Sequence, residues 1–189
     1  MYEVEVKAYL KNKKAVIVKL EGLGYKFSPE VHQVDHIFVP EEISFPPPLG
    51  VPVLRVRKQS DVCFFTLKIS QGNRTDSIER EIEIKDGDRM IEILEFLKWK
   101  ENILVDKKRI KAKFNDIEIV LDTVKNLGEF IEAEKIVKDK NHKNRENIQK
   151  DLFAFLETLG VKRKDHIVDG KYDIMLFEIY KKLGLLEIR

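Results

Sequence analysis

Charged and apolar residues alternate with a period of two along much of this chain. The alternation begins in the first nine residues, where charged side chains at every second position are separated by Val4, Val6 and Ala8. Successive side chains of a β-strand point to opposite faces, so this period predicts strands that are charged on one face and apolar on the other. Strands are predicted at residues 1–9, 31–39, 54–57, 64–69, 77–85, 103–114, 117–122 and 130–134.

Four other segments repeat their apolar residues every three or four positions, which is the spacing of one helix face. In the last of them, Leu176, Ile179 and Leu183 are in register, and Gly184 follows as a stop signal. Helices are predicted at residues 11–24, from Asp86 or Asp88 to about Lys100, from Asn144 to Gly160, and at 172–183. Because no repeat or linker separates these elements, the pattern predicts one domain over residues 1–189, of the α+β class.

The charged faces of the predicted strands carry both signs in nearly equal number. Their acidic residues are Glu3, Glu5, Glu79, Glu81, Glu83, Glu118, Asp122, Glu132 and Glu134. Their basic residues are Lys7, Arg55, Arg57, Lys68, Lys107, Arg109, Lys111 and Lys113. An open antiparallel sheet with its charged face in water fits this pattern. A closed barrel with the charges inside fits it equally, because a lumen must be nearly neutral when an unpaired buried charge costs several kcal/mol.

A barrel lumen of this composition favours a particular kind of ligand. Arg and Lys bind phosphate oxygens, and Arg does so through two parallel hydrogen bonds. Clustered carboxylates suit Mg²⁺ or Mn²⁺, which prefer oxygen ligands and bridge to the phosphates of a substrate. The two sets together indicate a metal–polyphosphate ligand rather than a simple anion.

The overall composition argues against several other classes of protein. The 189 residues are 36% charged with a formal net charge of +2, so the whole chain has no electrostatic preference for nucleic acid or membrane. Cys63 is the one cysteine, which excludes an intramolecular disulfide and a zinc site built from cysteines. No segment resembles a signal peptide or has the roughly 20 apolar residues of a membrane span, which indicates a cytoplasmic protein without membrane contacts.

Short motifs in a fixed order give the chain a family resemblance. The first is E-x-E-x-K at residues 3–7, and the last is L-G-x-F-x-E-x-E at residues 127–134. Between them lie Q-x-D-x-x-F at 33–38, L-R-x-R at 54–57, T-x-K at 66–68, E-x-E at 81–83, K-x-R at 107–109 and L-D at 121–122. In this order the motifs resemble those of the CYTH superfamily, the triphosphate tunnel metalloenzymes. The chain departs from these motifs where Glu79 replaces the arginine of R-x-E-x-E and where Ile37 replaces a frequent tyrosine, and the strand at 107–114 carries extra cations.

The resemblance implies an eight-stranded antiparallel closed β-barrel, a tunnel with a charged lumen and with helices packed outside. It also implies a Mg²⁺ or Mn²⁺ site, whose ligands would be Glu3, Glu5, Glu132 and Glu134, helped by Glu81, Glu83 or Asp122. The cations that would hold the triphosphate are Lys7, Arg55, Arg57, Lys68, Lys107, Arg109 and Lys111. Of these, Lys7, Arg57 and Lys107 are the expected catalytic residues.

The same resemblance implies an enzyme and leaves its reaction open. The chain resembles the class IV adenylyl cyclase-like branch, whose reaction converts ATP to cyclic AMP and pyrophosphate. The alternatives are a triphosphatase acting on inorganic triphosphate, thiamine triphosphate or a nucleoside triphosphate, and a non-catalytic binder of nucleotide or polyphosphate. The mixed charges of residues 138–150 disfavour a nucleic-acid partner, and the chain could form a homodimer.

Overall fold

The structure of the chain is a computed structural model that describes residues 2–138, 141–168 and 170–186. Its strands are β1 (Tyr2–Tyr9), β2 (Val31–Pro40), β3 (Pro52–Gln59), β4 (Val62–Ser70), β5 (Asp76–Ile84), β6 (Trp99–Phe114), β7 (Ile117–Val124), β8 (Gly128–Val137) and β9 (His166–Ile167). Its helices are α1 (Lys13–Gly22), α2 (Gly87–Phe96), α3 (His142–Thr158) and α4 (Tyr172–Leu183), with a 3₁₀ turn at Arg163–Asp165.

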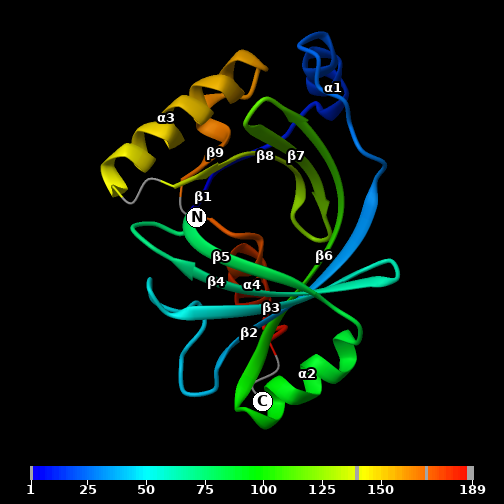
Figure 1. Cartoon of the computed structure of the whole chain (residues 1–189), viewed down its shortest axis with the longest axis vertical. Helices are drawn as coiled ribbons and strands as arrows, with labels where there is room; N and C mark the ends of the chain where they lie inside the picture. The colour runs from blue at the N-terminus through cyan, green and yellow to red at the C-terminus, as the bar shows by residue number, and fades with distance from the viewer. Residues whose placement is uncertain (1, 139–140, 169, 187–189) are drawn as a thin grey trace.

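The strands form one antiparallel sheet that closes on itself (Figure 1). Hydrogen-bonded neighbours follow the order β5–β4–β3–β2–β6–β7–β8–β1, and a pairing of β1 with β5 completes the ring. The closed eight-stranded barrel is therefore confirmed, and the open sheet is excluded. The two residues of β9 pair with Lys7 and Ala8 near the end of β1, whereas β5 pairs with Tyr2 to Val4 at its start. A two-residue strand shows no period, so the sequence pattern did not predict it.

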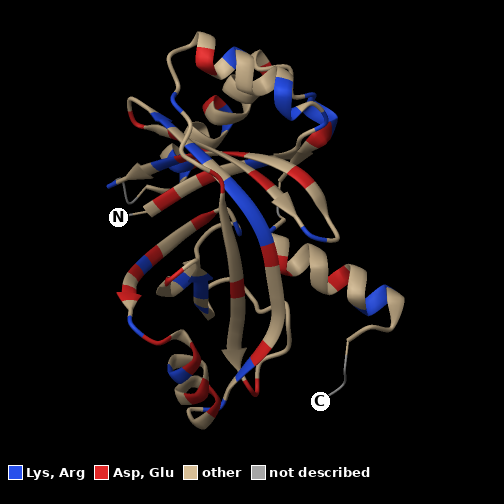
Figure 2. Ribbon diagram, turned by 90° about the vertical axis from the view of Figure 1, so that its right-hand side faces the viewer, with Lys and Arg blue, Asp and Glu red and all other residues tan. Residues whose placement is uncertain are grey.

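The registers of the strands place their charged faces on the same side. Thr66 lies opposite Glu81, and Lys68 lies opposite Glu79, between β4 and β5. Arg80 consequently belongs to the outer face, opposite Leu67. The ribbon coloured by charge shows acidic and basic segments recurring along the barrel strands (Figure 2).

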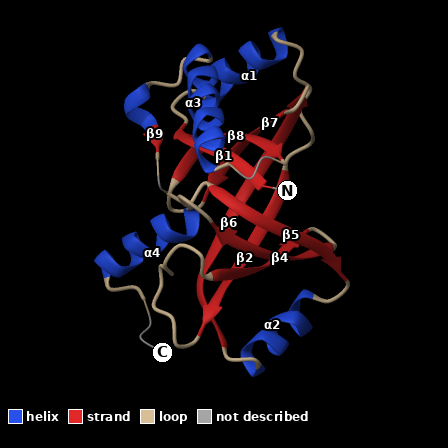
Figure 3. Ribbon diagram, turned by 60° about the vertical axis from the view of Figure 1, so that its left-hand side comes forward, coloured by secondary structure: helices blue, strands red, loops and turns tan. Residues whose placement is uncertain are grey.

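The largest apolar cluster lies between the outer face of the barrel and two helices. Val4 and Val6 of β1 are almost fully buried there, together with Leu20 of α1 and Leu152 and Leu156 of α3. Burying each such side chain stabilises the fold by about 1.5–3 kcal/mol. Figure 3 shows α1 and α3 together over one part of the barrel and α2 beside another part.

Two helix boundaries differ from the sequence prediction. α2 ends at Phe96 rather than near Lys100, because the backbone turns at Lys98 (φ 63°) and β6 begins at Trp99. α3 begins at His142, before the predicted start, because the side chain of Asn141 caps it by accepting a hydrogen bond from the N–H of Lys143 (3.0 Å).

α4 packs across one end of the barrel rather than on its side. Its buried residues Tyr172 and Leu176 contact a cluster that includes Val105 and Phe130 of the inner barrel face. The inner face of β6 changes along the strand from Val105 to the charged side chains that begin at Lys107. The lumen therefore has an apolar end against α4 and a charged remainder. Among the described residues, no helix is long and apolar enough to cross a membrane.

Candidate functional site

The lumen contains a cavity of about 480 Å³. Its lining comes from all eight barrel strands and from the first residues of α4. The lining includes every cation predicted for the site, namely Lys7, Arg55, Arg57, Lys68, Lys107, Arg109 and Lys111. It also includes the predicted acids Glu3, Glu5, Glu81, Glu132 and Glu134.

Two predicted metal ligands lie outside this lining. Glu83 is exposed toward the end of β5. Asp122 is fully buried, and its carboxylate accepts hydrogen bonds from Arg109 Nε (2.7 Å) and from the Nη2 atom of the same side chain. The geometry therefore gives Asp122 the position of a group that orients Arg109.

Three carboxylates meet at the boundary of β1 and β8. One oxygen from each of Glu5, Glu132 and Glu134 lies within 4.8 Å of the others. The strand register causes this, since Glu5 lies directly opposite Glu134. Burial raises the pKa of Glu134 well above its ordinary value, and the neighbouring charges of Glu3 and Glu132 raise it further. A divalent cation that prefers oxygen ligands would relieve this repulsion, so the donor set fits Mg²⁺ or Mn²⁺.

Glu132 joins the acidic cluster to the neighbouring cations. Its carboxylate accepts charged hydrogen bonds from Lys7 Nζ (2.8 Å) and Arg109 Nη2 (2.9 Å). Burial alone would raise the pKa of Glu132, but Lys7 and Arg109 hold it well below its ordinary value. Glu132 therefore stays ionised, and the two cations are held beside the carboxylate cluster.

Asp35 holds a second pair of cations on the opposite side of the lumen. Its carboxylate accepts hydrogen bonds from Arg57 Nε (2.6 Å), from Arg57 Nη2 (2.9 Å) and from Lys107 Nζ (2.9 Å). Burial works against ionisation, but Lys107 and Arg57 hold the pKa of Asp35 well below its ordinary value. Burial and the nearby charges of Arg109 and Arg57 lower the pKa of Lys107 to about 8.

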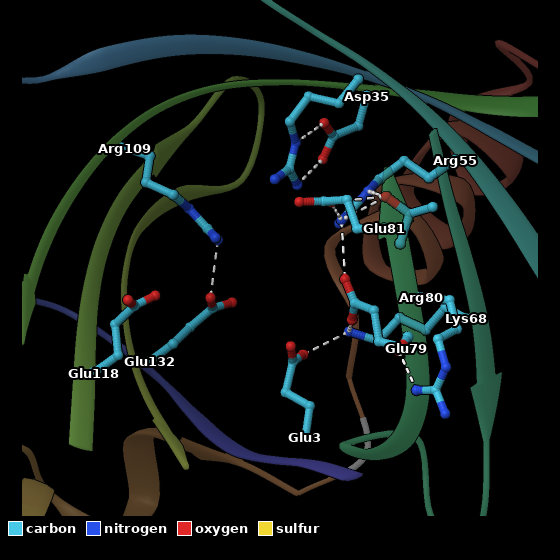
Figure 4. A network of polar contacts seen from close by, with 12 residues as sticks. Glu3, Asp35, Arg55, Lys68, Glu79, Arg80, Glu81, Arg109, Glu118 and Glu132 are labelled. Carbon is cyan, nitrogen blue, oxygen red and sulfur yellow. Dashed lines mark hydrogen bonds and ion pairs between the residues drawn. The ribbon is translucent and has the colours of Figure 1, made fainter. Parts of the chain in front are cut away.

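A third ion-pair network crosses from β3 to β5 (Figure 4). Arg55 Nη2 contacts Glu79 at 3.1 Å and Glu81 at 3.0 Å. Lys68 Nζ contacts Glu79 at 2.8 Å and Glu3 at 3.0 Å. Burial opposes the charge of Lys68, but Glu3 and Glu79 raise its pKa well above the ordinary value. These cations are therefore charged and face the cavity with acidic partners.

Sequence reasoning assigned no role to several lining residues. Asp35 lies in a quoted motif, and Glu79 was counted among the inner acids, but neither was expected at the site. Lys171 and Tyr172 were missed because helical periodicity does not show that the first turn of α4 enters the lumen. Lys171 Nζ donates to Ser70 Oγ (3.0 Å), and burial together with Lys68 lowers the pKa of Lys171 to about 8. The ring of Tyr172 lies 3.9 Å from Lys7 Nζ.

The arrangement can bind a polyanion together with a metal ion. Cations on several strands face a single cavity, while the acidic cluster of Glu5, Glu132 and Glu134 lies within the same space. The phosphate oxygens of a ligand would replace carboxylates as partners of the cations.

Comparison with known proteins supports the family resemblance. The model of the family described as CYTH domain matches residues 1–170. A protein of Methanocaldococcus jannaschii with the name "Putative adenylate cyclase MJ0240" is 32% identical over 174 residues, which cover 91% of this chain and 97% of that protein.

Solved structures share the fold. The PH1012 protein of Pyrococcus horikoshii has a TM-score of 0.74 and 30% identity, with 92% of this chain and 98% of that chain covered. The PH1819 protein of the same organism has a TM-score of 0.77 and 27% identity, with coverage of 94% and 99%. A Hippeastrum protein described as a putative adenylyl cyclase with a dominant triphosphatase activity has a TM-score of 0.58 and 15% identity, with coverage of 95% and 96%, and this likeness concerns the fold alone.

Proposed function

Because the chain belongs to the CYTH domain family, a family of divalent-metal enzymes, we propose that it is a metal-dependent enzyme that converts ATP to cyclic AMP and pyrophosphate. The motifs of the sequence resemble the cyclase-like branch of the family. The name of the relative from Methanocaldococcus jannaschii, which is 32% identical, supports the same reaction.

The observation that carries the proposal is the juxtaposition of two sets of charges in one cavity. β1 and β8 are paired neighbours, so Glu5, Glu132 and Glu134 form one cluster of carboxylates. Arg57, Lys107 and the other lumen cations face the same space. A simple anion would use the cations alone, whereas a metal-bound triphosphate uses both sets.

The residues divide the work of binding. Glu5, Glu132 and Glu134 would hold Mg²⁺ or Mn²⁺, which supplies positive charge beside the phosphates. The inner cations, namely Lys7, Arg55, Arg57, Lys68, Lys107, Arg109 and Lys171, would bind phosphate oxygens and neutralise the charge that develops on the leaving group. Asp35 and Asp122 orient three of these cations through the hydrogen bonds described above.

The position of the attacking group decides between two reactions. Attack of the ribose 3′-hydroxyl on the α-phosphorus gives cyclic AMP and pyrophosphate, whereas attack of water on the terminal phosphorus gives orthophosphate. Apolar residues of the β2–β3 connection and of α4, including Pro47, Val51 and Ile174, line the cavity and offer a surface for a nucleoside. This surface favours a nucleotide substrate over inorganic triphosphate.

Triphosphate hydrolysis is the second candidate. It is favoured by the spread of charged residues along the cavity, from Lys171 at one end to Lys113 and Glu118 in the β6–β7 hairpin. A ligand made entirely of phosphate would find partners along this whole length. Inorganic triphosphate and thiamine triphosphate are therefore included as substrates in the test.

The test resolves the products formed from ATP, inorganic triphosphate and thiamine triphosphate with Mg²⁺ or Mn²⁺. Cyclic AMP and pyrophosphate are expected from ATP, while orthophosphate would instead support hydrolysis. Glu134→Gln is expected to lose turnover, whereas Glu129→Gln, on the outer face of the same strand, serves as the matched control. Tight binding of triphosphate without turnover of any substrate would contradict the proposal and support a non-catalytic binder.

A further inference from the structure

The residues at the start of α4 change in chemical character along the chain, and three of them line the cavity beside β6 (Figure 3). Lys171 donates to Ser70 Oγ (3.0 Å) and lies close enough to Lys68 for the two charges to interact, so it belongs to the cationic part of the lumen. Ile174 belongs to the apolar part of the lining. Asp173 lies between these two residues in the chain, and it lines the same cavity.

The carboxylate of Asp173 differs from the other carboxylates of the cavity wall. Three of the others form the acidic cluster of Glu5, Glu132 and Glu134. Six more pair with a lysine or an arginine, namely Glu3, Asp35, Glu79, Glu81, Asp116 and Glu118. Within the ranges that the structure describes, the half-buried Asp173 has neither a hydrogen bond nor an ion pair through its side chain. Its oxygens are therefore left for a ligand in the cavity.

The charge of this carboxylate limits which part of a ligand can lie beside it. An ionised carboxylate accepts hydrogen bonds and donates none, and it repels a phosphate group. The phosphate chain of a ligand is thus expected to end at Lys171. In a nucleoside triphosphate the next group after the α-phosphate is the ribose, whose 2′- and 3′-hydroxyls both donate hydrogen bonds. Hydrogen bonds to a charged acceptor are stronger than those between neutral groups.

The helix dipole offers a second reason for an acid at this position. A negative side chain in the first turn of a helix stabilises the helix by interacting with its positive end. That role needs no cavity, and it has no effect on the choice between two ligands. Ligand selectivity and thermal stability therefore separate the two roles of Asp173.

We propose that Asp173 is a specificity-determining residue whose carboxylate accepts hydrogen bonds from the 2′- and 3′-hydroxyls of a ribonucleoside triphosphate. This assignment rests on the proposed nucleotide substrate. The ribose lies with its phosphates toward Lys171 and its base toward Ile174 and Pro47, all of which line the cavity. The chamber thus selects ribonucleotides over 2′-deoxyribonucleotides and over triphosphates without a sugar.

Calorimetric titration of the full chain with Mg²⁺ and ATP, 2′-deoxy-ATP or inorganic triphosphate tests the proposal. Wild type is expected to bind ATP about tenfold or more tightly than 2′-deoxy-ATP, because one hydrogen bond to a charged acceptor is lost. In Asp173→Ala this ratio is expected to fall to about one, while the affinity for inorganic triphosphate is not weakened. Asp173→Asn, which keeps one acceptor oxygen, is expected to retain part of the preference. A wild type without the preference, or an Asp173→Ala variant that keeps it, overturns the proposal.

Two controls exclude other roles of the carboxylate. Glu178→Ala removes an acid of the same helix that lies outside the cavity lining, and it is expected to keep the wild-type ratio. The melting temperature of Asp173→Ala is expected to stay within about 4 °C of wild type. A larger fall with an unchanged ratio would show that Asp173 serves the helix alone. An equal loss of affinity for thiamine triphosphate and ATP would show a general counter-charge rather than a ribose site.

Binding and turnover distinguish this proposal from the proposed reaction. A chain that prefers ATP to 2′-deoxy-ATP through Asp173 but forms no cyclic AMP contradicts the reaction and supports the ribose site. A chain that forms cyclic AMP and binds the two nucleotides equally overturns the ribose site and leaves the reaction standing.

Discussion

Replacing Asp35 by Asn tests whether the lumen is held by buried ion pairs. Asp35 is 3% exposed and is the shared acceptor of Arg57 and Lys107, which are also buried. The substitution keeps the shape of the side chain but leaves two buried cations without their anion. Removing one partner of a buried ion pair costs about 3–5 kcal/mol, because the remaining charge stays desolvated.

The expected loss of stability is large enough to measure by two methods. In a chain of this size, 1 kcal/mol shifts the melting temperature by about 2–4 °C, so the melting temperature is expected to fall by about 6–20 °C. Urea denaturation should give the corresponding loss of about 3–5 kcal/mol. The matched control is Asp106→Asn, because Asp106 pairs with the more exposed His32 and Lys125.

The two variants are expected to differ clearly in their free energy of unfolding. An exposed pair contributes about 0–1 kcal/mol, so Asp106→Asn is expected to change stability by no more than that. If Asp35→Asn were as stable as Asp106→Asn, the buried triad would not contribute as the distances indicate. The reasoning applied to the other lumen pairs would then be wrong as well.

Three further predictions concern pH, metal binding and the β1–β5 pairing that closes the barrel. Affinity for ATP, measured by calorimetry between pH 7 and 9, is expected to fall as the pH rises, because Lys107 and Lys171 have pKa values of about 8 and lose their charge there; an unchanged affinity would contradict this. Glu134→Gln is expected to weaken Mg²⁺ or Mn²⁺ binding by more than about tenfold in direct titration, since even outer partners of a metal contribute that much; equal affinity would exclude Glu134 as a ligand. Arg145→Ala is expected to lower the free energy of unfolding, measured by urea denaturation, by about 3–5 kcal/mol. The reason is that Asp76, which is 1% exposed, loses its two hydrogen bonds from Arg145 (2.7 and 2.9 Å). A loss below about 1 kcal/mol would refute this prediction.

The fold was largely predictable because the strands combine two independent requirements. The period of two fixes which residues share a face, and the near balance of charges permits that face to be enclosed. Periodicity could not give the end of α2, because the turn at Lys98 follows from the pairing of Trp99 with Pro40 across β6 and β2. It also could not show that Tyr172 and Leu176 pack against the inner face of the barrel, since an amphipathic helix fits any apolar surface.

The candidate site was predictable to the level of faces rather than of individual contacts. The sequence placed Lys7 and Glu132 on the charged faces of two strands, and the structure pairs these strands and joins the two side chains at 2.8 Å. The sequence could not distinguish Asp122, which binds Arg109, from the carboxylates of the cluster, because all of them lie on inner strand positions. That distinction depends on depth along the strand and on register, which are set only when the barrel closes.

The placement of α4 has a consequence for how new specificities could arise. The family match covers residues 1–170, yet Lys171, Tyr172 and Ile174 line the cavity. The strands of the barrel and the helix that lines part of the cavity are thus encoded by separate stretches of the gene. An exchange of α4 alone could reshape this end of the cavity for a different substrate while every strand stayed unchanged. Laboratory evolution of this protein would therefore begin with the codons for residues 171–183 rather than with those for the barrel strands.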